Sequence, residues 1–144
     1  FEAETQIRSV SCGDDFTIAL TSDGKVYVWG SGESGALGNE DSEDQPTPTL
    51  LDAFGGSEVT HISAGSTHAL AVTKEGVWSW GKGDAGALGH GSLEDQPTPK
   101  VIECTKDIAI SHVIASGAHS ILLGQKMSLS PKVPEEGEKE QGQE

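Results

Sequence analysis

The feature that most constrains this chain is an internal repeat. The segment at residues 20–30, Leu-Thr-Ser-Asp-Gly-Lys-Val-Tyr-Val-Trp-Gly, returns at 72–81 as Val-Thr-Lys-Glu-Gly-Val-Trp-Ser-Trp-Gly, with one residue deleted. The offset between the two copies is 52 residues before the deletion and 51 after it. Two further segments recur in the same phase: Gly-Ala-Leu-Gly at 35–38 and 86–89, and Glu-Asp-Gln-Pro-Thr-Pro at 43–48 and 94–99. Self-similarity at such a period is typical of repeat architectures, in which neighbouring units bury one another's apolar faces.

A third copy is present only in part. Residues 110–119 match residues 59–68, and the match stops at Leu123. The chain begins with Phe1 rather than with methionine, as a piece of a longer polypeptide or a processed product would. We therefore expect two complete units and one partial unit.

Each unit reads as short strands separated by turn residues. Ser22-Asp23-Gly24 and Lys74-Glu75-Gly76 have the composition of hairpin turns, and each leads into an alternating strand that ends in Trp-Gly. The Gln-Pro-Thr-Pro segments lead into a last strand, which begins at Thr49 or Lys100, and proline restricts that strand to a sheet edge. No segment has the length or periodicity of an amphipathic helix. The sequence predicts an all-β fold with about four strands per unit, and a four-stranded sheet repeated every ~40–50 residues is a β-propeller blade.

The units resemble the repeats of the regulator-of-chromosome-condensation family. The resemblance rests on Gly-x-x-His and an apolar run at 65–72, the acid-Gly turn, the Trp-Gly strands, the Gly-x-Leu-Gly loop and the proline before the last strand. It covers roughly residues 7–123 and implies a partial β-propeller, about two and a half four-stranded blades of a seven-bladed ring. Phe16 and Ser116 depart from the pattern, because they stand where the second unit has His68 and Gly65. The resemblance implies structural roles for the repeat positions Gly24, Trp29, Gly30, Gly38, His68, Gly76, Trp80, Gly81, Gly89 and His119.

The same resemblance gives a domain layout. Residues 1–124 are expected to form propeller repeats at about 7–58, 59–109 and 110–124, the last one partial. In that family the last blade is completed by strands from the N-terminal end of the protein, so we expect this chain to be the C-terminal third of a ring. Residues 125–144, rich in glutamate, are expected to form a disordered acidic tail. The apolar residues expected to need cover from the remaining blades, upstream in the same chain or in another chain, are Ile7, Val10, Val113, Ile114, Ile121, Leu122 and Leu123.

Composition excludes several classes of protein. The chain has 23 acidic and 9 basic residues and a formal charge of −14, which disfavours contact with a phosphate backbone. No apolar run approaches the ~18 residues of a membrane span, and the N-terminus lacks the features of a signal peptide. Cys12 and Cys104 match no metal or redox spacing. We expect an intracellular protein, in the nucleus or cytoplasm, with no membrane contact and no direct nucleic-acid contact from this segment.

Three motifs that could carry chemistry have structural interpretations. The glycines at 30–35 and 81–86 spell the dinucleotide fingerprint Gly-x-Gly-x-x-Gly, but they recur in phase with the repeat and no helix follows them. The repeat also explains the shared seven-residue spacing of His61 with His68 and of His112 with His119, beside which no further ligand stands. Trp29, Trp78 and Trp80 suit packing between blades. We therefore predict no cofactor, no metal and no catalytic residue.

Carboxylates recur at equivalent positions after the Trp-Gly strands. They form the candidate partner-binding site, which is a negative rim that attracts a basic protein surface. Its residues are Glu40, Asp41, Glu43, Asp44, Glu94 and Asp95. The alternative is ordinary solvated surface. Thr47-Pro48, Thr98-Pro99 and Ser130-Pro131 are minimal proline-directed phosphorylation sequences, of which the first two are explained as strand-entry prolines.

The resemblance implies a protein-binding propeller rather than an enzyme, similar to the family's exchange factors for Ran-type small GTPases. Such a factor docks one rim on the GTPase and releases its nucleotide without covalent chemistry. The alternatives are an interaction scaffold or a chromatin-associated propeller without exchange activity and, more remotely, a metal-dependent enzyme.

Overall fold

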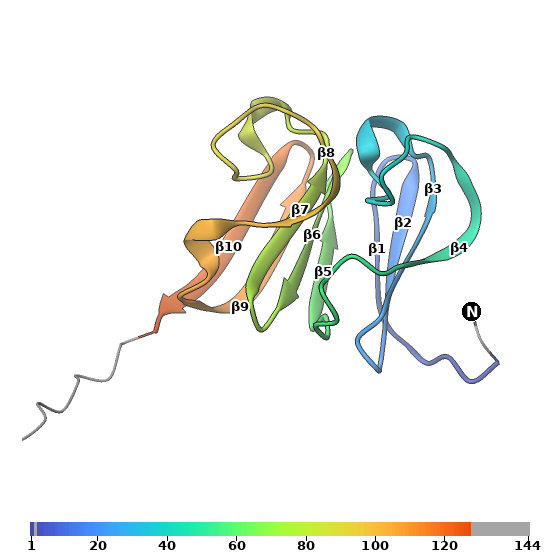
Figure 1. Cartoon of the computed structure of the whole chain (residues 1–144), viewed down its shortest axis with the longest axis horizontal. Coiled ribbons are helices and arrows are strands. Elements are labelled where there is room, and N and C mark those ends of the chain that lie inside the picture. Colours follow the sequence, from blue (N-terminus) through green and yellow to red (C-terminus); the bar gives the residue numbers. More distant parts are fainter. Residues whose placement is uncertain (2, 128–144) are drawn as a thin grey trace, which may run out of the picture.

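The computed structural model describes residue 1 and residues 3–127, and its ten strands form three antiparallel sheets (Figure 1). Four consecutive strands pair in sequence order and make the first blade. They are β1 (Ile7–Cys12), β2 (Phe16–Thr21), β3 (Val26–Gly30) and β4 (Gln45–Leu51). The expected acidic tail falls almost entirely on residues 128–144, which lie outside the described residues.

The second blade repeats this order, and the third is a hairpin. The strands of the second blade are β5 (His61–Ala64), β6 (His68–Thr73), β7 (Gly76–Gly81) and β8 (Gln96–Val101). The third sheet pairs β9 (Ile108–Ser116) with β10 (His119–Lys126). The helical elements of the described residues are three single 3-10 turns: η1 (Glu33–Gly35), η2 (Asp84–Gly86) and η3 (Glu103–Thr105). None is long or apolar enough to cross a bilayer.

The last strand of each complete blade begins earlier than the sequence predicted. β4 pairs with β3 at Gly30 opposite Gln45, and the register then shifts before Val28 meets Thr49. The prolines of the Gln-Pro-Thr-Pro segment lie in this shifted stretch. Since β4 is an edge strand, the missing N–H groups of the prolines interrupt no central ladder.

Apolar side chains fill the spaces between blades. At junction one, between the first and second blades, Ile18 and Leu20 of β2 belong to one buried cluster with Ala69, Ala71 and Trp80. At junction two, between the second and third blades, residues of β6 and β7 meet β9 and β10. The members of this second cluster and its partly buried neighbours are Leu70, Val72, Val77, Ile102, Ala115, Ile110, Val113 and Leu122. The prediction of an all-β partial propeller is confirmed.

Of the apolar residues expected to need cover from further blades, some are already packed against the second blade and the others are exposed. Val113 and Leu122 face the second blade and pack against its cluster, so the structure corrects their assignment to the uncovered surface. Side chains of β10 alternate in direction, which places Ile121 and Leu123 on the opposite, exposed face. Ile114 of β9 and the β1 residues Ile7 and Val10 are also exposed.

The blades have two distinct ends. The loop rim consists of the connections at 13–15, 31–44, 65–67, 82–95 and 117–118, and it is at the top of Figure 1. The hairpin rim consists of the turns at 22–25 and 74–75 and the segments that lead into β1, β5 and β9, at the bottom. The two complete blades therefore present their long connections, 31–44 and 82–95, at the same rim, where the short turn of the third blade also lies.

Candidate functional site

Hydrogen bonds between the innermost strands set the spacing of the blades beneath the loop rim. The Ala64 N–H of β5 donates to the Ser11 hydroxyl of β1 at 2.9 Å, and the Ala115 N–H of β9 donates to the Ser63 hydroxyl of β5 at 2.9 Å. The connections are also joined, because the Ser66 N–H donates to the Gly117 carbonyl at 2.9 Å. The loops of the rim therefore stand on a framework with a repeated geometry.

A loop of each complete blade is tied to the blade that follows it. At junction one, the Trp80 indole N–H donates to the Ala36 carbonyl at 3.0 Å, and the Glu40 N–H donates to the Pro97 carbonyl of β8 at 3.1 Å. Trp80 is fully buried, and a Cβ at Gly38 would lie only 2.9 Å from the indole ring. The loop at 31–44 is thus held at several points by the second blade.

At junction two, the loop carbonyl equivalent to that of Ala36 accepts its hydrogen bond from a hydroxyl instead of an indole N–H. Ala87 occupies the repeat position of Ala36, and its carbonyl accepts from the Ser120 hydroxyl of β10 at 2.8 Å. The Ser120 oxygen lies 2.9 Å from Nε2 of His68, which is buried between the blades. Because the hydroxyl proton is used by Ala87, His68 donates from Nε2. Burial is the main cause that lowers the pKa of His68, so the ring is neutral at pH 7.

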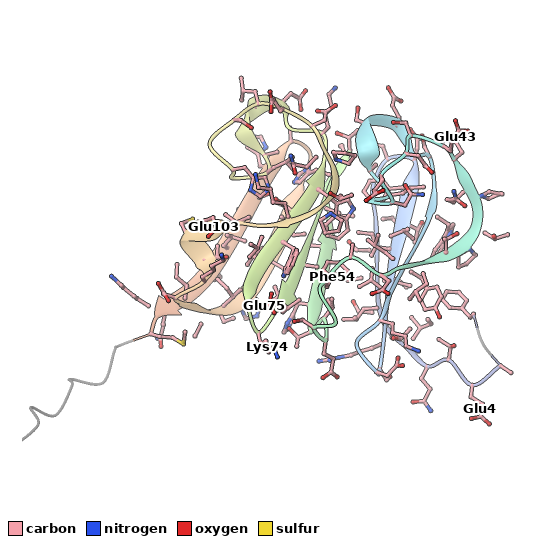
Figure 2. All side chains as sticks on the ribbon, viewed as in Figure 1. Glu4, Glu43, Phe54, Lys74, Glu75 and Glu103 are labelled. Atoms are coloured by element: carbon pink, nitrogen blue, oxygen red, sulfur yellow. The ribbon has the colours of Figure 1, made fainter. Side chains whose placement is uncertain are left out.

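Sequence reasoning missed an aromatic contact at the blade junctions. Phe54, in the segment that leads into β5, packs against Trp78 and Trp80 with ring centroids 5.7 and 5.9 Å apart (labelled in Figure 2). Phe1 stands in the corresponding place before β1 and contacts Tyr27 and Trp29 at 4.9 and 6.1 Å. Phe1 and Phe54 are 53 residues apart, whereas the repeat offset in this part of the chain is 52 residues, so an alignment of the repeats does not pair them.

Two of the six candidate carboxylates accept hydrogen bonds from glycine N–H groups near the start of their loops. Asp44 accepts from the Gly32 N–H at 3.0 Å, and Asp95 accepts from the Gly83 N–H at 2.9 Å. At Gly32 a Cβ would collide with the backbone of Glu43, so the fingerprint glycine permits a close approach of chain to chain. The helical structure at each fingerprint is a single 3-10 turn within it, Glu33–Gly35 or Asp84–Gly86, whereas a dinucleotide site needs the N-terminus of a helix.

The other candidate carboxylates project from the loop rim. Asp41 accepts from the Glu43 N–H at 3.1 Å, which shapes the local turn. The side chains of Glu40, Glu43 and Glu94 are exposed and have no hydrogen-bond partner among the described residues. Figure 2 shows Glu43 at the loop rim, far from Glu4 at the other end. The acidic residues of the rim are Asp14, Asp15, Glu33, Glu40, Asp41, Glu43, Asp44, Asp84, Glu94 and Asp95.

Basic side chains are distributed unequally between the two rims. In the connections that make up the loop rim, the one lysine is Lys82, whose ammonium lies 3.4 Å from the Asp84 carboxylate. On the hairpin rim, Lys25, Lys74 and Lys106 stand among the carboxylates. Among the described residues, the loop rim therefore carries ten carboxylates against one lysine, and the hairpin rim carries seven carboxylates against three lysines, so the excess of negative charge is larger on the loop rim.

A partly buried polar pair, Ser79 with His90, distinguishes the second loop from the first. Ser79 donates to the Leu88 carbonyl at 2.7 Å, and its oxygen lies 2.8 Å from Nε2 of His90. Burial is the main cause that lowers the pKa of His90. In the first unit the equivalent residues are Val28 and Asn39, and Oδ1 of Asn39 is buried without a hydrogen-bond partner. Replacement of the serine by valine explains this unsatisfied oxygen.

The histidines and cysteines do not assemble into a site. His61, His112 and His119 are exposed, in contrast to His68. Within the described residues, no three His, Cys, Asp or Glu side chains come close enough together to hold a metal ion. Cys12 and Cys104 are free thiols on the surface.

Comparison with known proteins gives the family. The model of the regulator of chromosome condensation (RCC1) repeat matches residues 23–72 and 74–123, which is more than half of the chain. The chain belongs to the RCC1 repeat family. A second RCC1 repeat model matches residues 7–36 and 59–87. The recognition made from the Trp-Gly strands and glycine loops is therefore confirmed.

RCC1 relatives are diverse and mostly much longer. The chain is 39% identical over 125 residues to the human E3 ubiquitin-protein ligase HERC2, with 85% of the chain and 3% of the relative covered. It is 37% identical over 118 residues to the ultraviolet-B receptor UVR8 of Arabidopsis thaliana, which covers 81% of the chain and 27% of the receptor. Among solved structures, Prp20p of Saccharomyces cerevisiae superposes with a TM-score of 0.80 and 28% identity over 89% of this chain and 33% of that one. The chain thus spans about a third or less of these relatives.

Proposed function

We propose that this chain is part of an RCC1 propeller that docks a basic protein surface on its loop rim, and that the whole protein promotes nucleotide exchange on a Ran-type small GTPase. The observation that carries the proposal is the concentration of carboxylates on one rigid rim. The candidate site within it consists of Glu40, Asp41, Glu43, Asp44, Glu94 and Asp95. A rim of one charge steers a partner of opposite charge and fixes its orientation.

The proposed roles of these residues differ. Asp44 and Asp95 hold their loops through the glycine N–H groups, so they act as positioning residues. Glu40, Glu43 and Glu94 are available to meet lysine or arginine side chains. Exchange needs no covalent chemistry, because a factor that binds nucleotide-free GTPase more tightly than loaded GTPase must, by linkage, weaken the binding of the nucleotide. A structural relative supports this assignment, since Prp20p binds Gsp1p and histones.

A second candidate function is an interaction scaffold without exchange activity. It is favoured by the range of the relatives, which include a ubiquitin ligase and an ultraviolet-B receptor. In both cases we place the protein in the nucleus or cytoplasm, with repeats at about 7–58, 59–109 and 110–124 within residues 1–124.

A nucleotide-release assay separates the two functions. The complete protein should accelerate release of a fluorescent GDP analogue from Ran in a panel of small GTPases. Unchanged release from every member would contradict the exchange assignment and leave the scaffold.

A charge-reversal experiment tests the rim itself. The triple variant Glu40→Lys, Glu43→Lys, Glu94→Lys should slow association with nucleotide-free Ran by about tenfold at low salt, and the difference should shrink as salt is added. The matched control Glu4→Lys, Asp52→Lys, Asp107→Lys makes the same charge change at the hairpin rim and should have a much smaller effect. Equal effects of the two triples would show that net charge, rather than the loop rim, governs binding.

A further inference from the structure

Hydroxyl side chains that precede carboxylates occur at several places in this acidic chain, and the fold makes them unequally accessible. A protein kinase with a basic peptide-binding site favours a hydroxyl that is followed by acidic residues, because complementary charge orients the bound segment. The serines and threonines with a carboxylate three residues later in the sequence are Ser11, Thr49 and Ser92. The structure shows which of these hydroxyls a kinase can reach in the folded protein.

Ser11 and Thr49 are both held in strands. Ser11 lies in β1, and its hydroxyl accepts the Ala64 N–H of the next blade at 2.9 Å. Thr49 lies in β4, and its hydroxyl donates to the Thr47 carbonyl at 3.0 Å. Each hydroxyl is therefore already bonded, and each residue belongs to a paired strand, so a kinase reaches either one only after the strand has separated from its sheet.

Ser92 lies in the loop rim, in the connection between β7 and β8. Residues 91–95 are all exposed, and the adjacent Leu93 keeps 70% of its surface accessible. Among residues 3–127, the Ser92 hydroxyl has no hydrogen-bond partner, and none of the backbone hydrogen bonds in the loops involves residues 90–95. This segment can therefore enter the active site of another protein while the blade beneath it stays folded.

The two carboxylates after Ser92 are presented together with its hydroxyl. Glu94 is exposed, and its side chain makes no hydrogen bond within the described part of the chain. Asp95 is also exposed and accepts the Gly83 N–H at 2.9 Å, which fixes its position relative to the base of the loop. Both carboxylates are thus available to basic groups of a kinase that binds this segment.

The first loop also carries a serine among carboxylates, but its setting differs. Ser42 has Gln45, rather than a carboxylate, three residues later. Two residues before Ser42, the Glu40 N–H donates to the Pro97 carbonyl at 3.1 Å and ties the segment to the second blade. Ser42 is therefore an internal comparison for Ser92 on the same rim.

We infer that Ser92 is a phosphorylation site for a protein kinase that recognises acidic sequences, and that its phosphate adds to the negative charge of the loop rim. The γ-phosphoryl group of ATP is transferred to Oγ of Ser92. The new O–P bond forms as the bond from the γ-phosphorus to the β,γ-bridging oxygen breaks, ADP leaves with that electron pair, and the hydroxyl proton passes to the base of the kinase.

The phosphate changes the charge of the rim at the tip of the second loop. A phosphoserine carries about −1.5 to −2 charges at pH 7, next to Glu94 and Asp95. More negative charge speeds the encounter with a basic surface, and salt weakens this effect. The consequence for binding rests on the proposed function, whereas the modification itself does not.

Treatment of the folded 144-residue chain with casein kinase 2 and ATP tests the modification. Tandem mass spectrometry should locate the phosphate at Ser92, labelled at least about tenfold faster than Ser11 or Ser42. The double variant Glu94→Gln, Asp95→Asn should lower kcat/KM for Ser92 by about tenfold or more, because it removes both acidic contacts. Circular dichroism verifies that this variant is folded.

Synthetic peptides separate the effect of the fold from that of the local sequence. Peptides with the sequences of residues 6–20 and 87–101 should be labelled at Ser11 and Ser92 at comparable rates, because neither serine is protected there. The inference is overturned if the folded chain gains no phosphate at Ser92, if its Ser11 or Ser42 is labelled as fast as Ser92, or if the double variant is labelled as fast as the unsubstituted chain.

The effect on the loop rim is measured with the complete protein. After kinase treatment, association with nucleotide-free Ran should be about two- to threefold faster at low salt, and Ser92→Ala treated in the same way should show no increase. Phosphate at Ser92 without faster association would contradict charge steering by the rim, and with it the proposed function. Absence of phosphate at Ser92 would overturn the present inference and leave the proposed function as it stands.

Discussion

Trp80 is the side chain whose loss should damage the blade junction most. Its side chain is 0% exposed, its N–H is bonded to the Ala36 carbonyl, and its ring lies 5.9 Å from that of Phe54. Removing a fully buried indole costs about 3–5 kcal/mol of the free energy of unfolding, and a buried carbonyl left without a donor costs about 1–3 kcal/mol more. Trp80→Ala should therefore cost about 4–8 kcal/mol, which is a large part of the about 5–15 kcal/mol that stabilises an ordinary domain.

Trp80→Phe separates the two contributions, because it keeps most of the ring and removes the N–H. We expect it to cost about 1–3 kcal/mol in urea unfolding followed by circular dichroism. Trp29 is a matched control, since it occupies the same repeat position but is only half-buried, and its indole N–H has no hydrogen-bond partner among the described residues. Trp29→Phe should change the free energy of unfolding by less than about 0.5 kcal/mol. Equal losses at the two positions would refute the role given to the indole hydrogen bond.

Two further predictions concern buried polar groups. The pKa of His68 is lowered in the folded state, so the unfolded chain takes up the proton first, and the stability contributed by neutral His68 is lost as the pH falls below about 6.5. Between pH 7 and 5, urea unfolding should show a smaller loss of stability for His68→Phe than for the unsubstituted chain; parallel pH profiles would contradict this. Val28→Thr should cost less than about 0.5 kcal/mol, because its hydroxyl can meet the unpaired Asn39 oxygen, whereas Val26→Thr, equally buried without such a partner, should cost about 1–3 kcal/mol. Equal thermal shifts for the two threonine variants would refute that reasoning.

Most of the fold could be predicted because the repeat carries its information locally. Turn glycines, alternating strands and the Trp-Gly ends are each visible within a few residues, and the Trp-Gly strands of both complete blades lie where these signals placed them. The starts of β4 and β8 were missed, because pairing across a bulge depends on the partner strand rather than on the prolines themselves. The direction of Val113 and Leu122 was missed because it depends on the register of β9 with β10.

The candidate site was less accessible to sequence reasoning. Equal repeat phase placed Glu43 and Glu94 on the same rim, but the pattern gave no reason to separate them from Asp44 and Asp95. That separation depends on hydrogen bonds to glycine N–H groups 12 residues earlier in the chain. The pairing of Ser79 with His90 was also missed, because the equivalent residues of the first unit, Val28 and Asn39, form no such pair.

Because the following blade donates a hydrogen bond to a carbonyl in each long loop, a single blade of this chain is not a self-contained unit that recombination could exchange. Ala36 depends on an indole supplied by the next unit, and Ala87 depends on a hydroxyl supplied by the next unit. Exchange of a single blade between two family members would separate a loop carbonyl from the side chain of the next blade that donates a hydrogen bond to it. Viable chimaeras of this fold should therefore join at points that keep each loop together with the first half of its successor.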